Sequence, residues 1–399
     1  MNYILFDDSV RDNLLPLTFT RPVADIRIGI LTIREKWEKY LEVKTSTKTQ
    51  NYLSEKYPTE FTIDEDNVWI NASFCPNSKL VEEIRLLPSN HALFSGNILI
   101  AANSGNDKKP DLPVNSRLFE GIFKRNESNV TAMRIENVWD IFSKNGDAVN
   151  DDFKLITKGR KSHELSKTNQ VIGIDHVFIE EGARVECAVL NASSGPIYIG
   201  KNTEIMEGSL IRGPFALCEH SVLKLGSKIY GPTTIGPYSK VGGEINNSVI
   251  FGYSNKAHDG FLGNSVLGEW CNIGADSNNS NLKNNYAEVK LWNYQAEKFI
   301  NTGLTFCGLI MGDHSKCGIN SMFNTGTVVG VNANIFGSGF PRNFIPSFSW
   351  GGAAGFSTYK LTDAFEVAKR VYERRGIEFG ETDKRILSKV FELTEKYRK

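Results

Sequence analysis

The sequence predicts a left-handed parallel β-helix in the second half of the chain, preceded by an α/β segment and followed by two helices. A branched aliphatic residue recurs at every sixth position from Ile199 to Val241. A helix has a period of 3.6 residues and a strand a period of two, whereas a β-helix coil consists of three short strands of about six residues each. Glycine and proline fall between the aliphatic positions, as at Gly213-Pro214 and Gly236-Pro237, where tight corners need them. The recurring residues are Ile199, Ile205, Ile211, Leu217, Leu223, Ile229, Ile235 and Val241.

The six-residue period returns twice later in the chain. It returns first at Val249, Phe261, Leu267 and Ile273, with Asn255 as the one exception. It returns again at Met311, Cys317, Phe323, Val329 and Ile335. The stretch from Asp276 to Cys307 interrupts it, and in this fold such excursions leave a corner and reach a neighbouring subunit. Because flat faces of the prism are buried when three copies stack side by side, we expect a homotrimer.

The first 150 residues read as an α/β domain. Tyr3 to Phe6 is a short apolar strand that ends at Asp7-Asp8, and α/β folds place ligands at such strand ends. Helices are expected at 31–41, 81–86 and 137–143, and further strands at 68–70 and 98–101. The predicted domains are 1–150 for the α/β domain, 151–170 for a linker, 171–350 for the β-helix and 351–399 for a helical tail. Within the tail, helices are expected at 362–374 and 382–397 after a break at Gly351 to Gly355.

Composition excludes several classes of protein. The formal net charge is zero and the pI is near 7.0, which argues against a nucleic-acid partner. The six cysteines contain no Cys-x-x-Cys pair and suit a reducing compartment. No signal-like start and no run of 18 apolar residues is present, so we expect a cytoplasmic protein without a membrane span.

A motif near the N-terminus resembles the start of sugar-nucleotidyltransferase domains. Leu15-Pro16-Leu17-Thr18 and Arg21-Pro22 fit that family, and Arg11 stands for the arginine of its glycine loop. The resemblance implies that Arg11 and Arg21 bind nucleotide, although both are equally compatible with a structural role. The glycine loop itself is replaced by Asp7-Asp8-Ser9, and Val23 stands where the family has lysine. Two carboxylates would repel a triphosphate unless a metal such as Mg²⁺ lay between them.

A second motif lies in the β-helix. The chain reads Lys-Ala-His258-Asp-Gly-Phe261-Leu-Gly, with Glu244 fourteen residues before the histidine and Asn272 fourteen after it. This resembles the acetyltransferase half of bifunctional glucosamine-1-phosphate acetyltransferase/uridylyltransferases. The opening Leu-Thr-Phe-Thr-Arg-Pro-Val-Ala-Asp points to their archaeal and Bacteroidetes-type relatives. The family fold implied is a nucleotidyltransferase-like (Rossmann-like) domain joined to a hexapeptide-repeat β-helix.

The resemblance implies roles for particular residues. Acetyl transfer needs a deprotonated amine, and His258 takes the position of the family's general base. Glu244 would orient the imidazole or hold the amine. The implied substrate-binding residues are Asn272, Asn281 and Lys283, which align with residues at the acceptor, and Lys228 and Lys290, which would neutralise a sugar phosphate. Asn246 stands where a phosphate-binding lysine is common, and Phe261 where a tyrosine is common.

The function implied is N-acetylation of an amino-sugar phosphate by acetyl-CoA, with a possible second step of nucleotidyl transfer toward a nucleotide sugar such as UDP-N-acetylglucosamine. Acetyl-CoA would lie along coils 311–335, near Lys316 or Arg342. The alternative is a regulatory or scaffold protein whose first domain binds nucleotide sugar without turnover. A zinc carbonic anhydrase of the same fold is disfavoured, because no two histidines are five residues apart. The sequence leaves any metal ligands undefined.

Overall fold

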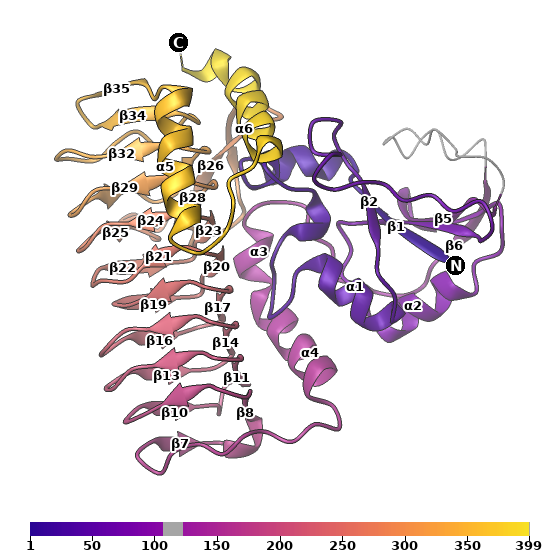
Figure 1. Ribbon diagram of the computed structural model, residues 1–399, viewed down its shortest axis with the longest axis horizontal. Coiled ribbons are helices and arrows are strands. Elements are labelled where there is room, and N and C mark those ends of the chain that lie inside the picture. The colour runs from indigo at the N-terminus through magenta and orange to yellow at the C-terminus, as the bar shows by residue number, and fades with distance from the viewer. Residues whose placement is uncertain (107–122, 399) are drawn as a thin grey trace. The chain divides into compact units, whose positions relative to one another are not determined.

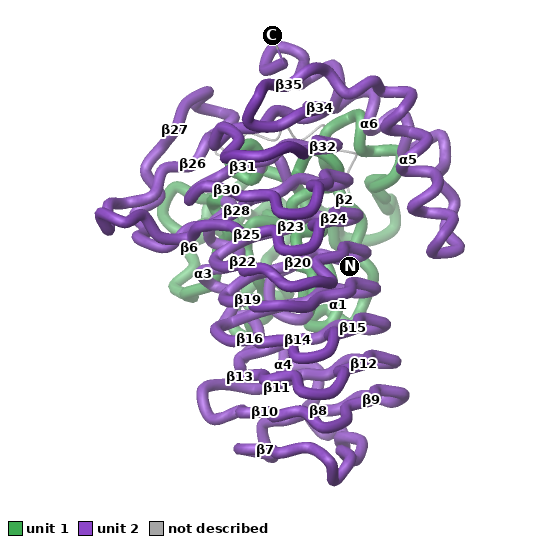
Figure 2. Tube along the Cα trace, turned by 90° about the vertical axis from the view of Figure 1, so that its left-hand side faces the viewer, with its two compact units in different colours: residues 1–14, 18–26, 31–137 green, residues 15–17, 27–30, 138–399 purple. Residues whose placement is uncertain are grey.

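The computed structural model describes residues 1–106 and 123–398, and the chain forms two compact units (Figures 1 and 2). Unit 1 contains residues 1–14, 18–26 and 31–137. Unit 2 contains residues 138–399 together with two short pieces of the N-terminal region, residues 15–17 and 27–30. The predicted fold class, an α/β unit followed by a β-helix with terminal helices, is confirmed.

Unit 1 is built on a six-stranded mixed sheet with the order β2-β1-β3-β5-β4-β6. Strand β1 pairs in parallel with both β2 and β3, while β5 runs antiparallel to β3 and β4. The strands are β1 (Asn2–Phe6), β2 (Ser46–Lys48), β3 (Asn67–Asn71), β4 (His91–Ser95), β5 (Ile98–Asn103) and β6 (Lys124–Glu127). Apolar side chains of four of these strands, among them Ile4, Trp69 and Phe94, form one core cluster.

Two helices accompany this sheet, α1 (Ile33–Leu41) and α2 (Ser78–Arg85). Helix α1 begins where Thr32 and Glu35 form a capping box: the Thr32 hydroxyl accepts from the Glu35 amide, and the Glu35 carboxylate accepts from the Thr32 amide. Trp37 is fully buried, and its indole N–H donates to the Phe74 carbonyl over 2.9 Å. Burial of this aromatic side chain anchors the helix.

Unit 2 is a parallel β-helix with three faces. The first face holds β7 (Gln170–Ile172), β10 (Val189–Asn191), β13 (Leu210–Arg212), β16 (Lys228–Tyr230), β19 (Glu244–Asn246) and β22 (Phe261–Gly263). The second face holds β8 (Val177–Ile179), β11 (Ile197–Ile199), β14 (Phe215–Leu217), β17 (Thr233–Ile235), β20 (Val249–Gly252), β23 (Val266–Glu269), β28 (Leu309–Met311), β31 (Thr327–Val329) and β33 (Phe344–Ile345). The third face holds β9 (Arg184–Val185), β12 (Glu204–Ile205), β15 (Val222–Leu223), β18 (Lys240–Val241), β21 (Asn255–Lys256), β24 (Asn272–Ile273), β29 (Lys316–Cys317), β32 (Asn334–Ile335) and β34 (Ser349–Gly352).

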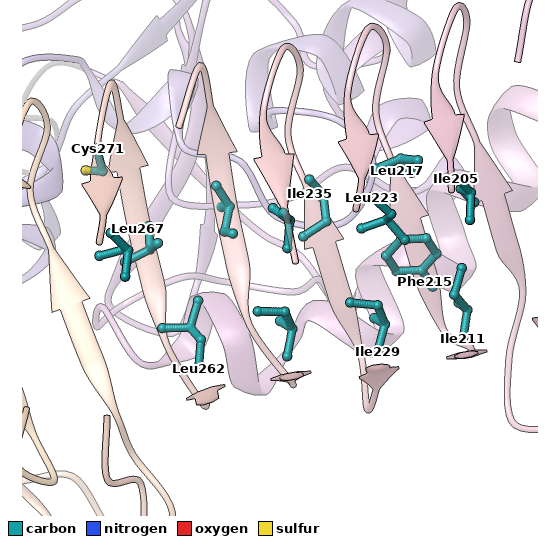
Figure 3. Packing of buried hydrophobic residues seen from close by; sticks show 14 of the residues in the cluster. Ile205, Ile211, Phe215, Leu217, Leu223, Ile229, Ile235, Leu262, Leu267 and Cys271 are labelled. Atoms are coloured by element: carbon teal, nitrogen blue, oxygen red, sulfur yellow. The ribbon is translucent and has the colours of Figure 1, made fainter. Parts of the chain in front are cut away.

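The interior of the β-helix is one continuous apolar core (Figure 3). All eight aliphatic residues predicted from Ile199 to Val241 belong to it, as do the five predicted from Met311 to Ile335. In between, the prediction was one residue out of register at two places. Ile250 and Leu262 point inward there rather than Val249 and Phe261. The prediction failed because the coil length changes at this point.

Coil length explains that shift of register. Ile205 pairs with Leu223, and Leu223 with Val241, each 18 residues further along the chain. Val241 pairs with Lys256, which lies only 15 residues further on. The short coil therefore ends with a lysine at the inward position, one residue after the predicted exception Asn255. A strict period of six cannot follow a coil that loses three residues.

The second face of the β-helix is covered by residues of unit 2 itself. Helices α3 (Asp140–Ser143) and α4 (Asn145–Thr157) belong to this unit, so the predicted linker 151–170 begins within a helix. The Gly29 amide donates to Asn145 Oδ1 over 2.8 Å, and the Thr234 hydroxyl donates to the Gly29 carbonyl over 3.0 Å. Arg27 Nε donates to the Phe251 carbonyl over 3.1 Å. Residues 27–30 are thus an integral part of the β-helix unit.

The later coils carry two additions. Strands β25 (Asn278–Asn279) and β30 (Met322–Phe323) pair with each other, and β26 (Lys290–Asn293) and β27 (Lys298–Asn301) form an antiparallel hairpin inside the predicted excursion. The expected break at Gly351 to Gly355 is instead a tight antiparallel turn between β34 and β35 (Gly355–Thr358). Two helices follow, α5 (Leu361–Glu373) and α6 (Glu381–Leu393), as predicted. None of the helices in residues 1–106 and 123–398 has the length and apolar character needed to cross a membrane.

Candidate functional site

Glu244 lies on the first face of the β-helix, at the start of strand β19. Its carboxylate accepts a hydrogen bond of 2.6 Å from the Tyr230 hydroxyl, one coil below. Burial and the neighbouring Glu244 carboxylate raise the pKa of Tyr230 to about 12, so the phenol keeps its proton and remains a donor. Sequence reasoning missed Tyr230. It lies two residues after the candidate Lys228, and only the short coil brings it beside Glu244.

His258 lies on the corner of residues 257–260, between β21 on the third face and β22 on the first. Its side chain is exposed. This corner stacks directly on Gly243, because a Cβ added to Gly243 would lie 2.9 Å from the His258 carbonyl oxygen and 2.8 Å from that of Gly260. Gly243 also has a φ of +76°, so only glycine suits this position. Since Glu244 follows Gly243 in the chain, the predicted base and the predicted carboxylate lie at the same edge of the β-helix.

The register of the first face places the other candidates. Lys228 pairs with Glu244, and Glu244 pairs with Phe261, so these side chains form one row on the outside of the face. Asn246 lies in the neighbouring row, between Tyr230 and Gly263. A cation, a carboxylate and an amide therefore lie within one short stretch of the exposed face, below the corner that carries His258.

Asn281 joins this surface through a chain of amides. The Asn264 amide N–H donates to the Asn246 carbonyl over 3.0 Å. The Asn281 side-chain amide donates to Asn264 Oδ1 over 2.8 Å. Asn281 thus lies at the far end of strand β22 from His258. Its side chain also has a structural use, because it helps to hold the turn at Asn264.

Asn272 lies apart from Glu244, on the third face. It pairs with Asn255 in the coil below and with Lys316 in the coil above. Its side chain is exposed, and the third face leads into the corner of His258 three residues after Asn255. Lys316 itself is turned onto the His314 carbonyl, which its ammonium group contacts over 2.8 Å.

Lys283 and Lys290 lie in the excursion and line a hollow of about 670 Å³. Arg342 from the last coils lines the same hollow, together with the aromatic side chains of Phe299 and Phe344. The Lys283 ammonium donates to the Glu288 carbonyl over 2.6 Å, which fixes the loop between them. Three cations beside two aromatic rings form a surface suited to a phosphorylated ligand.

Unit 1 has its own cavity, of about 490 Å³, at the C-terminal end of β1. Its lining includes Asp8, Arg11, Asp12, Asn71 and Arg134. The Asp8 carboxylate accepts from the Asn71 amide over 2.8 Å and forms an ion pair of 3.2 Å with Arg134. Sequence reasoning missed Asn71 and Arg134, because nothing local in the sequence connects either residue with Asp8.

The two arginines predicted to bind nucleotide are both buried. Arg11 lines the cavity, but its guanidinium donates to the Thr18 carbonyl and to the Tyr52 hydroxyl, each over 2.8 Å. Arg21 is buried outside the lining of the cavity. Arg11 therefore has a clear structural role in holding the segment of the Leu-Pro-Leu-Thr motif.

Asp7, which precedes the cavity residue Asp8, is completely enclosed. Burial raises its pKa to about 6, against the opposing effects of the Thr49 hydroxyl, the Val23 amide and Arg11. Its carboxylate accepts from the Thr49 hydroxyl over 2.6 Å and from the Val23 amide over 2.8 Å. Asp7 thus connects the end of β1 to the segment that follows the motif. Among the described residues, no group of three His, Cys, Asp or Glu side chains is arranged to hold a metal, and we derive no step through Mg²⁺.

A unit built on a mixed sheet with a polar cavity at a strand end, joined to a hexapeptide-repeat β-helix with His258 and Glu244 at one edge, defines a class of two-part transferases. Comparison with known proteins agrees with this class. Residues 3–161 match the family model described as sugar nucleotidyl transferase. The bifunctional sugar-1-phosphate nucleotidylyltransferase/acetyltransferase of Sulfurisphaera tokodaii is 24% identical over 382 residues, which cover 82% of this chain and 93% of that protein.

A shorter match reaches the bifunctional protein GlmU of Methanocaldococcus jannaschii, which is 33% identical over 89 residues. It covers 22% of this chain and 21% of that protein. Among solved structures, Arabidopsis UDP-N-acetylglucosamine acyltransferase aligns over 59% of this chain and 82% of its own, with 13% identity and a TM-score of 0.21. At this score the alignment adds nothing to the fold, which the strand pairing already establishes. The chain is related to bifunctional nucleotidylyltransferase/acetyltransferases, and the prediction of a transferase enzyme is confirmed.

Proposed function

We propose that this protein transfers the acetyl group of acetyl-CoA to the amine of an amino-sugar phosphate of the glucosamine 1-phosphate type, in the cytoplasm. The observation that carries the proposal is the shared edge of the β-helix at which His258 overlies Gly243, next to Glu244 and its donor Tyr230. A base, a carboxylate and a cation on one exposed face match the needs of amine acetylation. The relationship to a sugar-1-phosphate nucleotidylyltransferase/acetyltransferase supports the substrate class.

The chemistry assigns a role to each group. His258 accepts a proton from the substrate ammonium or from the attacking amine, whose nitrogen then forms a bond to the thioester carbonyl carbon. The carbon–sulfur bond breaks, and the proton held by the imidazole neutralises the departing thiolate. Glu244, held by Tyr230, faces the same edge and positions the amine through its carboxylate. Lys228, paired with Glu244 in register, would lie near the phosphate of the acceptor.

The cationic hollow completes the proposal. Lys283, Lys290 and Arg342 line it together, so the negative charge of a substrate phosphate would be neutralised there. Phe299 and Phe344 provide flat apolar surface beside these cations, as a nucleotide-containing coenzyme requires. Asn246, Asn272 and Asn281 remain proposed contacts of the acceptor.

A mass-spectrometric assay tests the proposed function. The protein is incubated with glucosamine 1-phosphate and acetyl-CoA, first alone and then with each nucleoside triphosphate. Acetylated sugar phosphate should form without any nucleotide, and a nucleotide sugar should form only if unit 1 also turns over. Absence of acetylated product from all amino-sugar phosphates tried would reject the proposed function.

We further propose that three copies of the β-helix assemble into a trimer. The outer surface of the first face exposes apolar side chains in successive coils, with Ile172 54%, Leu210 51% and Tyr230 37% exposed. Apolar surface of this kind is covered when prisms stack side by side. Light scattering at micromolar concentration should therefore give about three times the chain mass of 44.5 kDa. A mass equal to that of one chain would contradict this assembly.

Unit 1 carries the second candidate function, nucleotide-sugar binding without turnover. The loop after β1 forms a 3₁₀-helix, Ser9–Leu14, in place of a glycine loop. Its amides are already engaged, because the Val10 amide donates to Asp8 Oδ1 over 2.9 Å and the Arg11 amide to the Asp8 carbonyl over 3.1 Å. The backbone donors that would hold a triphosphate are therefore occupied, and a carboxylate lies at the cavity.

We expect weak triphosphate binding by unit 1. Each missing charge-assisted hydrogen bond costs about 1.5–3 kcal/mol, so two missing amides shift the dissociation constant by roughly two to four orders of magnitude relative to a glycine-loop enzyme. Titration calorimetry with each nucleoside triphosphate in the presence of Mg²⁺ should show dissociation constants in the millimolar range, about 1 mM or weaker. Asp8→Asn serves as the comparison, because it removes the carboxylate charge and should strengthen binding. Micromolar binding by the unmodified protein together with rapid pyrophosphate release would contradict this expectation.

A further inference from the structure

Lys256 breaks the apolar pattern of the β-helix interior. The inward position of the third face is aliphatic or cysteine in the neighbouring coils, as Val241, Ile273 and Cys317 show. Lys256 occupies the same row, with only 1% of its surface exposed. A buried ammonium group is costly unless hydrogen bonds replace its water, so a lysine at this position needs partners inside the prism.

The partners of Lys256 are the backbone carbonyls of the corner that carries His258. The ammonium donates to the carbonyl of His258 and to that of Asp259, the latter over 3.0 Å. Burial lowers the pKa of Lys256 to about 8, so the ammonium form persists at neutral pH and serves both carbonyls. The two peptide groups on either side of the Asp259 Cα are thereby fixed from the inside of the prism.

Other corners along this edge of the β-helix are held differently. Each has a serine immediately before the strand of the first face, and its hydroxyl donates to a corner carbonyl. Ser209 bonds the Met206 carbonyl over 2.8 Å, and Ser227 bonds the Lys224 carbonyl over 2.6 Å. The equivalent residue in the His258 corner is Gly260, which has no hydroxyl.

Close packing explains why no serine holds this corner. Gly260 has a φ of +110°, and a Cβ at this position would lie 2.1 Å from the Ser277 carbonyl oxygen. A side chain is therefore excluded, and the corner carbonyls need a donor from elsewhere. Lys256 supplies it across the interior of the coil. The unusual lysine and the unusual glycine are two parts of one local solution.

We propose that Lys256 is a positioning residue of the acetyl-transfer site, fixing the backbone from which the His258 imidazole projects. This inference rests on the proposed function only for the role of His258. The anchoring of the corner by Lys256 is independent of that function. Because base catalysis depends on placement within a fraction of an ångström, a corner without its internal donor should hold the imidazole less well.

Lys256→Met tests the proposal, since methionine keeps a long apolar side chain of similar volume and removes the donors. We expect kcat for acetyl transfer to fall about tenfold, with the KM for acetyl-CoA unchanged, because the imidazole acts on the amine. Hydrogen–deuterium exchange of residues 257–261 should accelerate by a similar factor or more. Ser209→Ala is the matched control, because it removes the donor of an equivalent corner that carries no proposed site residue. It should loosen its own corner and leave kcat within twofold of wild type.

The outcomes separate the proposals. A folded Lys256→Met trimer with a wild-type kcat would overturn the positioning role, as would an equal loss of kcat in Ser209→Ala. If the methionine variant does not fold, Lys256→Gln retains a shorter donor and is measured in the same way, with a smaller loss of kcat expected. Inactivity of the wild-type protein toward amino-sugar phosphates would reject the proposed function instead. In that case unchanged exchange at 257–261 would still overturn the anchoring by Lys256.

Discussion

Replacing His258 with alanine should lower kcat for acetyl transfer by roughly 10²–10⁴-fold, the usual contribution of a positioned general base. The imidazole is exposed on its corner and lies at the edge of the face that carries Glu244. Without it, the amine must lose its proton to water, while the binding of acetyl-CoA is unaffected. Steady-state kinetics should therefore show the loss in kcat and little change in the KM for acetyl-CoA.

Two comparisons sharpen this experiment. His176→Ala removes another exposed histidine from the β-helix and should leave kcat within twofold of wild type. Glu244→Gln keeps an acceptor for the Tyr230 hydroxyl and should cost less than His258→Ala if Glu244 only orients the site. The wild-type rate should rise with pH as the imidazole loses its proton, and the alanine variant should lack that limb. If His258→Ala kept most of its rate and the same pH limb, another group would be the base.

Leu223→Ala should produce the second large effect, a loss of about 2–5 kcal/mol in the free energy of unfolding. Leu223 is fully buried in the apolar core, and the coils above and below restrict collapse of the cavity. Leu225→Ala is an unusually close control, because the same side chain two residues away is 67% exposed. It should change stability by about 0.5 kcal/mol or less. Urea titration followed by circular dichroism measures both variants, and equal effects would contradict the inward assignment of Leu223.

Much of the fold was predictable from the sequence, because the β-helix repeats a local rule. Each coil needs an aliphatic residue at fixed spacing, so Ile199 to Val241 announce the interior without any knowledge of long-range contacts. The rule fails where coil length changes. No local pattern shows that only 15 residues separate Val241 from Lys256, and the register after that point was therefore one residue out at Val249 and Phe261.

The candidate site was predictable only where a motif is continuous in sequence. His258 and Glu244 belong to such a motif, whereas Tyr230 and Lys256 contribute through coil stacking that the sequence does not display. The N-terminal cavity shows the same limit, since Arg134 pairs with Asp8 across 126 residues of chain. Arg11, which looked available for a nucleotide, is turned onto the Thr18 carbonyl by a contact seven residues away.

The inclusion of residues 27–30 in the β-helix unit has a consequence for biosynthesis. Arg27 bonds the Phe251 carbonyl, 224 residues later in the chain. At a translation rate of roughly 5–20 residues per second, this segment leaves the ribosome about 10 to 45 s before its partner coil exists. Asn145 and Asp152 are synthesised between the two and bond the Gly29 and Ile30 amides over 2.8 Å each. The nascent chain must therefore keep its first thirty residues available until the middle coils emerge, and a gene fragment that starts after them would encode a β-helix missing part of its second face.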